Sequence, residues 1–332
     1  MSHEIASQQV IKPPVIGRGD TVGIVAPSSP IFEEGDVEFT FEWLERLGLR
    51  WKVGKNTFKR WSDLAGTDEE RLSDFHAMWA DPEVKLILPI RGGNGSVRLL
   101  PHLDFELIRN NPKVLIGYSD ITGLLIPIHQ KTGLVTMHGP TAGSFFESEY
   151  TYENFVRLLT RTDPGGEVPD PEQKDDWNPD YPPYRMVIAP GRGSGRLTGG
   201  CLTLIRQLMG TAWEIETRGR LLFIEDVGEE PHSIDRMITQ LELAGKLRDI
   251  AGLIVGECVS CRPGNSKRNV LSLNQSVEAM LREKFEGARY PVIYGMRIGH
   301  SADKCTLPLG VMASLAADDE MVVLKLEESA TS

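Results

Sequence analysis

The stretch Val114-Leu115-Ile116-Gly117-Tyr118-Ser119-Asp120 places three apolar residues directly before a glycine and, two positions later, a serine. A helix-like segment, 121–131, follows. This pattern predicts a buried strand that turns sharply into a helix and exposes the turn residue at the carboxyl end of the strand. Open α/β sheets bind their ligands at that end. Ser119 is therefore a candidate nucleophile beside the N–H groups of a helix start, although serine is also a common helix N-cap.

Short apolar runs alternate with helical stripes through the first half of the chain. Residues 21–26, 84–90 and 134–137 are predicted strands, and 84–90 is apolar enough to be buried on both faces. Such alternation is typical of an α/β fold with a doubly wound parallel sheet. We therefore expect an N-terminal domain of this kind at 15–150.

The second half mixes strands with helices and is predicted to form a smaller, mixed α/β C-terminal domain at 185–332. Residues 310–316 and 321–326 alternate between apolar and polar side chains, which predicts a closing hairpin. The two domains are joined by a predicted linker, 151–184, rich in Pro, Asp and Gly after its first helical turns. Long loops in compact proteins are commonly functional, so its aromatic residues, Trp177 among them, indicate a lid or a docked flap.

The composition limits the classes of partner. The chain has 332 residues, 40% of them apolar, and a formal net charge of −11. This charge argues against a nucleic acid or an anionic membrane as partner. Four cysteines suit a reducing compartment, and Cys258 and Cys261 lack two further ligands at the spacing of a zinc site. No apolar run has the length of a membrane span, and residues 1–14 lack the apolar core of a signal peptide, so we expect a cytoplasmic protein.

A serine nucleophile needs a base and a carboxylate that orients the base. Among seven histidines, His300 is placed best, in a polar loop after a predicted strand, and His138 also lies at a strand end. Glu225 at the end of the strand 221–224 is the strongest candidate for the acid. Asp226 is adjacent, but in an extended chain it faces the opposite side.

The order serine, acid, histidine is that of the α/β-hydrolase triad. The common hydrolase motif G-x-S-x-G is nevertheless absent, because Ile121 stands where the second glycine would be. A glycine-rich segment, 91–96, follows another predicted strand and could bring backbone N–H groups close to a ligand. Its spacing does not fit a dinucleotide fingerprint, and a plain tight turn is the alternative.

Several stretches together resemble the LD-carboxypeptidase family of serine peptidases, which includes muropeptide carboxypeptidases and microcin C immunity peptidases. The resemblance covers the chain from about Gly19 to Leu326. It is carried by Ile116-Gly-Tyr-Ser-Asp-Ile-Thr122, Arg91-Gly-Gly-Asn-Gly95, Leu222-Phe-Ile-Glu-Asp-Val-Gly-Glu229, Ile234-Asp-Arg-Met237, Gly252-Leu-Ile-Val-Gly256, Gly299-His300 and Leu307-Pro-Leu-Gly310.

The resemblance implies a flavodoxin-like N-terminal domain that carries the nucleophile and a C-terminal domain that carries the acid and the base. The triad would be Ser119, Glu225 and His300, at the interface between the domains. The backbone N–H groups of Asp120 and Gly93 would form the oxyanion hole. The family also implies a homodimer and neither a metal ion nor an organic cofactor.

The expected activity is hydrolysis of the L-to-D amide bond that releases terminal D-Ala from murein tetrapeptides in cell-wall recycling. Arg91 could bind the free carboxylate of such a substrate by a bidentate contact. The alternative is a peptidase that cleaves peptidyl-nucleotide antibiotics, where Trp177 could stack on a nucleobase. A third hypothesis, from another class, is a non-catalytic protein that binds an anion or small ligand, in which Glu225 and His300 would have no reason to converge on Ser119.

Overall fold

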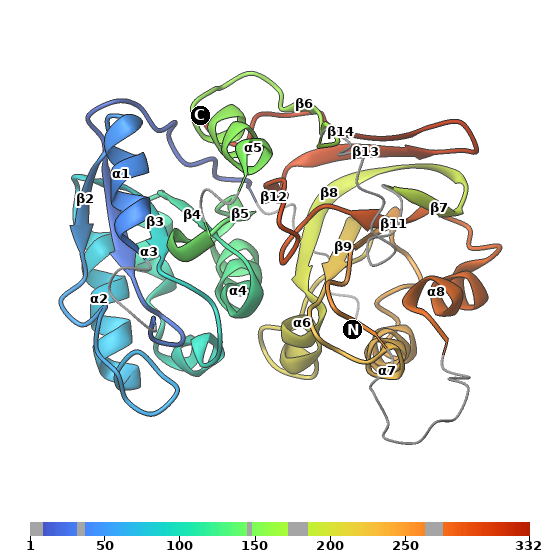
Figure 1. The fold of residues 1–332 in the computed structure, drawn as a ribbon, viewed down its shortest axis with the longest axis horizontal. Coiled ribbons are helices and arrows are strands. Elements are labelled where there is room, and N and C mark those ends of the chain that lie inside the picture. Colours follow the sequence, from blue (N-terminus) through green and yellow to red (C-terminus); the bar gives the residue numbers. More distant parts are fainter. Residues whose placement is uncertain (1–8, 32–36, 145–147, 172–184, 263–274) are drawn as a thin grey trace.

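The computed structural model describes residues 9–31, 37–144, 148–171, 185–262 and 275–332. Within these residues the strands form two sheets that lie side by side (Figure 1). The N-terminal half of the chain builds most of the first sheet, and the C-terminal half builds the second. The two-domain α/β organisation predicted from the sequence is therefore confirmed.

The first sheet has the strand order β12-β5-β4-β3-β1-β2. The pairs from β2 to β5 are all parallel, and the order β2-β1-β3-β4-β5 is that of flavodoxin-like folds. Buried apolar side chains fill β1, β3 and β4, as expected for a sheet covered on both faces. The bounds are Thr21–Val25 (β1), Arg50–Val53 (β2), Val84–Pro89 (β3), Val114–Gly117 (β4), Thr136–His138 (β5) and Leu307–Leu309 (β12).

Helices connect these strands. The start of α2 is fixed by a capping box in which Thr67 and Glu70 satisfy each other's backbone N–H groups. Two short helices between β3 and β4, η2 and α3, were not predicted. The bounds are Glu38–Arg46 (α1), Asp68–Ala80 (α2), Ser96–His102 (η2), Phe105–Asn110 (α3), Ser119–Ile121 (η3), Thr122–Thr132 (α4), Ala142–Ser144 (η4) and Glu149–Leu159 (α5).

The second sheet is mixed, with the order β6-β14-β13-β8-β9-β10-β11-β7. Its centre, from β8 to β11, is parallel, and its edges are antiparallel. The predicted closing hairpin is present as β13 and β14. The bounds are Gly166–Glu167 (β6), Met186–Ala189 (β7), Gly191–Cys201 (β8), Leu221–Glu225 (β9), Gly252–Gly256 (β10), Val292–Met296 (β11), Met312–Ala317 (β13) and Val322–Leu326 (β14).

Three helices lie along one side of this sheet, below it in Figure 1: α6 (Leu202–Leu208), α7 (Pro231–Leu243) and α8 (Val277–Phe285). The sequence around residues 195–198 predicts only a short strand, whereas β8 spans Gly191–Cys201. The glycines of β8 lower its strand propensity, but they allow the backbones of neighbouring segments to approach closely. A Cβ on Gly193 would lie 1.8 Å from the backbone oxygen of Ala251.

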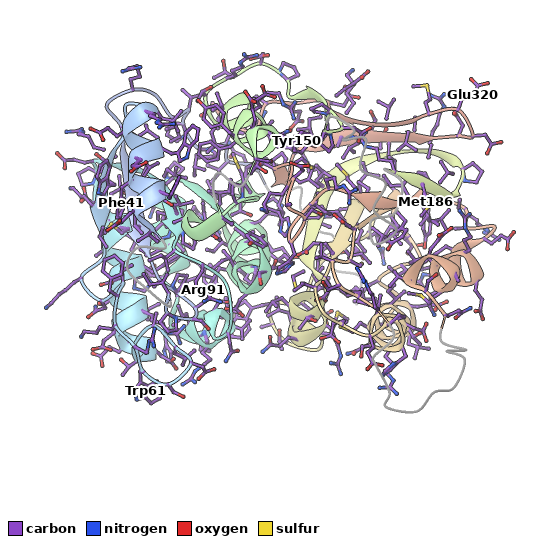
Figure 2. The ribbon with its side chains drawn as sticks, in the orientation of Figure 1. Phe41, Trp61, Arg91, Tyr150, Met186 and Glu320 are labelled. Carbon is purple, nitrogen blue, oxygen red and sulfur yellow. The ribbon has the colours of Figure 1, made fainter. Side chains whose placement is uncertain are left out.

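The two halves are closely joined. Strand β12 comes from the C-terminal half but pairs antiparallel with β5 of the first sheet. Helix α4 lies between the sheets, and nearly all of its residues are buried. Figure 2 shows Arg91 on the N-terminal side of this boundary, Met186 on the far side, and Tyr150 of α5 near the junction. Residues at the inner ends of both sheets can therefore share one site.

No helix in the described part of the chain is both long and apolar enough to cross a membrane.

Candidate active site

Ser119 lies at the turn from β4 into η3. Its backbone has a φ of 60°, in the left-handed region that non-glycine residues seldom adopt. Such conformations cost about 1–3 kcal/mol and gather at functional sites. The serine side chain makes no capping hydrogen bond at the start of η3 or of α4. The helix-cap interpretation of this serine is therefore wrong, and the turn holds a partly buried serine in a strained backbone conformation.

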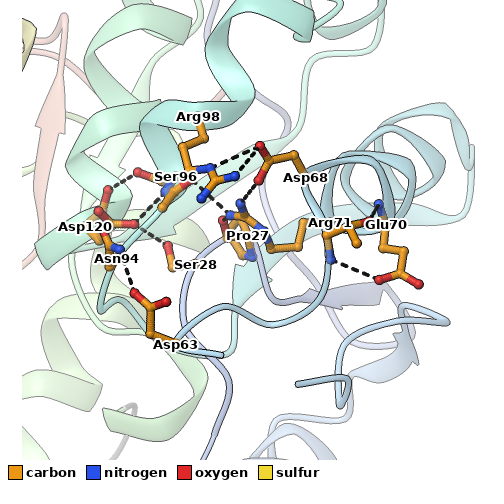
Figure 3. A network of polar contacts seen from close by, with 12 residues as sticks. Pro27, Ser28, Asp63, Asp68, Glu70, Arg71, Asn94, Ser96, Arg98 and Asp120 are labelled. Carbon is orange, nitrogen blue, oxygen red and sulfur yellow. Dashed lines mark hydrogen bonds and ion pairs between the residues drawn. The ribbon is translucent and has the colours of Figure 1, made fainter. Parts of the chain in front are cut away.

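A polar network behind the turn fixes its position (Figure 3). The Asp120 carboxylate accepts a hydrogen bond of 2.6 Å from the Ser28 hydroxyl and one of 2.8 Å from the Ser96 backbone N–H. The Ser96 hydroxyl donates to the Asp120 carbonyl oxygen at 2.5 Å. Asp120 and both serines are buried, so one carboxylate joins the loop after β1, the start of η2 and the nucleophile turn.

The glycine-rich segment packs directly against Ser119. A Cβ on Gly92 would lie 2.8 Å from the Cβ of Ser119 and 3.2 Å from the backbone nitrogen of Asp120. Only glycine permits this approach, and the next residue, Gly93, lines the same cavity as Ser119. Buried Arg71 supports the segment from behind, because its guanidinium donates to the carbonyl oxygens of Pro27 and Gly95.

Glu225 and His300 come from two strands of the second sheet, β9 and β11, that have β10 between them. Glu225 ends β9, and its Oε2 lies 2.7 Å from Nδ1 of His300, which follows β11. The same oxygen accepts the His300 backbone N–H at 3.3 Å. Gly299 has a φ of 64°, and a Cβ there would lie 2.1 Å from the carboxyl carbon of Glu225. The glycine before the histidine therefore makes the room that the pair needs.

This pairing determines the protonation of both groups. Burial disfavours the charged imidazole, but the adjacent Glu225 carboxylate outweighs burial and raises the pKa of His300 above its ordinary 6.5. Burial alone would raise the pKa of Glu225, yet the charge of His300 and its hydrogen bonds lower it. Glu225 is thus an anion whose charge stabilises the protonated imidazole of His300.

Ser119 and His300 line one cavity of about 400 Å³. Arg91 and Gly93 also line it, so four of the predicted site residues share this space. Trp177 lies outside the described residues. The complete lining is Ile31, Ile90, Arg91, Gly92, Gly93, Tyr118, Ser119, Thr141, Gly143, Ser144 and His300.

The other candidates have different partners. Asp226 turns away from the cavity and accepts from the backbone N–H and the hydroxyl of Thr203, so it supports the start of α6. Cys258 and Cys261 are buried free thiols. Within the described residues, no three His, Cys, Asp or Glu side chains are grouped so as to hold a metal ion.

Sequence reasoning missed three contacts around the histidine. The Tyr118 ring lies 5.0 Å from the His300 ring in an edge-on arrangement, and Nζ of buried Lys304 lies 5.7 Å from the centre of the Tyr118 ring. Buried His138 lies on the other side of Glu225. Tyr118 precedes Ser119, and Lys304 follows His300 by four residues, but nothing in the sequence indicates that Tyr118 and Lys304 meet.

Two family models match the chain. The model of the LD-carboxypeptidase N-terminal domain matches residues 22–139, and that of the LD-carboxypeptidase C-terminal domain matches residues 194–315. Together they include Ser119, Glu225 and His300.

Individual proteins are similar over almost their whole length. A probable murein peptide carboxypeptidase of Bacillus subtilis is 37% identical, over 95% of this chain and 94% of its own. A solved structure of the microcin C7 self-immunity protein in complex with aspartyl sulfamoyl adenosine is 30% identical, with a TM-score of 0.84, covering 97% of this chain and all of that one. A muramoyltetrapeptide carboxypeptidase from Oxalobacter formigenes is 27% identical, with a TM-score of 0.76, covering 93% and 99%.

Proposed function

Because the chain belongs to the LD-carboxypeptidase family of serine peptidases, we propose that it hydrolyses the L-to-D amide bond of murein tetrapeptides and releases the terminal D-Ala. The observation that carries the proposal is the 2.7 Å contact between Glu225 and His300 at the edge of the cavity that also holds Ser119. The similarity to murein peptide and muramoyltetrapeptide carboxypeptidases supports the substrate class.

Ser119 is the nucleophile in this proposal. Nδ1 of His300 is engaged by Glu225, so Nε2 is the ring nitrogen that takes the serine proton as the hydroxyl attacks the amide carbon. The imidazolium then donates this proton to the leaving amine of D-Ala. Water hydrolyses the acyl-enzyme with the same histidine as base, and the serine hydroxyl is restored.

The negative charge of the tetrahedral intermediate needs donors beside the serine. We assign this role to the backbone N–H groups of Asp120, which follows Ser119, and of Gly93, which follows the glycine packed against Ser119. One such donor typically contributes about 3 kcal/mol to transition-state stabilisation. Arg91, which lines the same cavity, is assigned to the free carboxylate of the substrate.

A second candidate is the cleavage of peptidyl-nucleotides by the same triad. It is favoured by the similarity to the microcin C7 self-immunity protein, solved with aspartyl sulfamoyl adenosine. In both versions the protein acts in the cytoplasm as a homodimer and needs no metal ion or cofactor. The non-catalytic alternative does not explain why a buried carboxylate orients a histidine toward the cavity of a strained serine.

Incubation with a murein tetrapeptide and, separately, with an aminoacyl sulfamoyl adenosine, followed by mass spectrometry, tests the proposal. We expect release of D-Ala from the tetrapeptide. Cleavage of the nucleotide substrate alone would favour the second candidate. Absence of cleavage of either compound by folded protein would contradict both peptidase assignments.

A further inference from the structure

Glu225 has a second buried histidine beside it, and the triad does not use that histidine. Oε2 of Glu225 binds His300, while Oε1 faces Nε2 of His138 at 3.7 Å. His138 is fully buried and ends β5, in the first sheet. Glu225 therefore lies between His300, which lines the cavity, and His138, which belongs to the first sheet.

The atoms that face each other here are unpaired. Oε1 of Glu225 and both ring nitrogens of His138 have no hydrogen-bond partner among the described residues. Buried polar atoms are nearly always paired, because leaving a buried donor or acceptor without a hydrogen bond destabilises the fold. At 3.7 Å the contact exceeds hydrogen-bond length, and an approach of about 0.7 Å would make it a good one. Catalytic hydrogen bonds are commonly long without substrate and tighten in the complex.

Neighbouring residues aim the His138 ring at the carboxylate. Phe223, two residues before Glu225 on β9 and so on the same face, packs edge-on against the ring at 5.4 Å. The backbone of His138 is fixed by the pairing of β5 with β12, in which His138 lies opposite Leu307. The His138 ring therefore extends from β5 against Phe223 of β9, on the face where Glu225 lies.

The protonation state of His138 allows its ring to donate a hydrogen bond to Glu225. Burial lowers the pKa of His138 to about 4, against the opposing effect of Glu225, so the ring is neutral at physiological pH. A neutral imidazole carries one N–H, and on Nε2 it can donate to Glu225 without cancelling its charge. Other titratable groups also interact with Glu225 or His300. They are Asp226 and Lys304, which act on His300, and the Cys201 and Cys258 thiols, which interact with Glu225.

We propose that His138 is a positioning residue, which donates a hydrogen bond from Nε2 to Oε1 of Glu225 across the domain boundary and so holds Oε2 on His300. The inference rests on the triad proposed above. The proposed hydrogen bond makes the position of Glu225 depend on the docking of the two sheets, because its donor, His138, comes from the sheet that carries Ser119.

A pair of variants of similar size separates hydrogen bonding from packing. In His138→Gln the side-chain amide can still donate to Glu225, whereas His138→Met fills similar space without a donor. We expect His138→Met to lower kcat by about 10- to 100-fold with KM nearly unchanged, and His138→Gln to recover most of the loss. Equal losses in the two variants, or wild-type kcat in His138→Met, would overturn the proposal.

A measurement on the wild-type protein covers the case in which neither variant folds. Nitrogen-15 NMR of the histidine rings reports which nitrogen carries the proton. The proposal requires neutral His138 with its proton on Nε2, and a proton on Nδ1 alone would refute it. Its failure is distinguishable from failure of the triad, because turnover by a Ser119→Ala variant tests the triad irrespective of His138.

Discussion

The nucleophile half of the site and its acid–base half are held in different ways. Around Ser119, the Asp120 carboxylate accepts hydrogen bonds from two neighbouring segments, and buried Arg71 ties two more carbonyl oxygens. Around Glu225, one carboxylate oxygen and both ring nitrogens of the facing His138 lack hydrogen bonds among the described residues. Ser119 is thus held by contacts within its own sheet, whereas the hydrogen bond proposed to complete the binding of Glu225 comes from the opposite one.

The largest expected effect comes from the nucleophile. Ser119→Ala should lower kcat by about 10⁴-fold or more, because the residues of a triad act as a unit. Turnover of the murein tetrapeptide measures the effect, and unfolding by urea shows whether the fold is kept. Ser73→Ala, at an exposed serine of α2, is the control and should retain wild-type kcat. Substantial hydrolysis by folded Ser119→Ala would remove the serine from the mechanism.

The acid–base half should be sensitive to a single methyl group. In Gly299→Ala the added Cβ would collide with the Glu225 carboxyl group, so we expect kcat to fall by about 10²- to 10³-fold. Gly287→Ala is a matched control, since Gly287 also has a positive φ, of 84°, but nothing within 4 Å of its missing Cβ. If both variants lose activity equally, backbone strain and not the Glu225 contact is responsible.

The nucleophile half should lose stability together with activity. Asp120→Ala leaves the buried donors of Ser28 and Ser96 unpaired, which should lower the free energy of unfolding by about 1–3 kcal/mol and kcat by about 10-fold. Urea unfolding and steady-state kinetics measure the two effects. Asp63→Ala removes an exposed carboxylate that binds Asn94 of the glycine-rich segment and should change stability by less than about 0.5 kcal/mol. An unchanged stability in Asp120→Ala would show that the network does not hold the turn.

The smallest effect concerns substrate binding alone. Arg91→Met should raise KM by about 10-fold for a substrate with a free carboxylate and leave kcat nearly unchanged. The rise should disappear when the substrate carboxylate is amidated. Arg98→Met, at an exposed arginine outside the cavity, is the control. An equal KM for amidated and free substrates in the wild-type enzyme would contradict the role of Arg91.

The sequence predicted the parallel sheet well because its strands are short apolar runs, and each ends at a polar or glycine turn. It also placed Ser119, Glu225 and His300 at strand ends, where parallel topology brings side chains together. It could not assign β12 to the first sheet, since three residues around Pro308 carry no pairing signal. The full length of β8 could not be predicted, because its glycines have low strand propensity. The structure explains them by the close approach of neighbouring backbones.

The contacts missed at the site share one physical cause. His138 and Glu225, like Tyr118 and Lys304, come from different elements whose packing places them together. Periodicity describes the faces of single elements, and it carries no information about which side chain of one sheet meets which of another. Such contacts between elements are therefore found only in the folded structure.

The central claim, that Glu225 and His300 of one sheet activate Ser119 of the other, is tested most directly by the pH dependence of Ser119 acylation. The base must be neutral, so the rate should rise with pH through a midpoint above 6.5, because Glu225 raises the pKa of His300. In Glu225→Gln the carboxylate charge is lost, the pKa of His300 falls, and the midpoint should move to lower pH while the plateau rate drops. A midpoint that stays in place in this variant would contradict the claim.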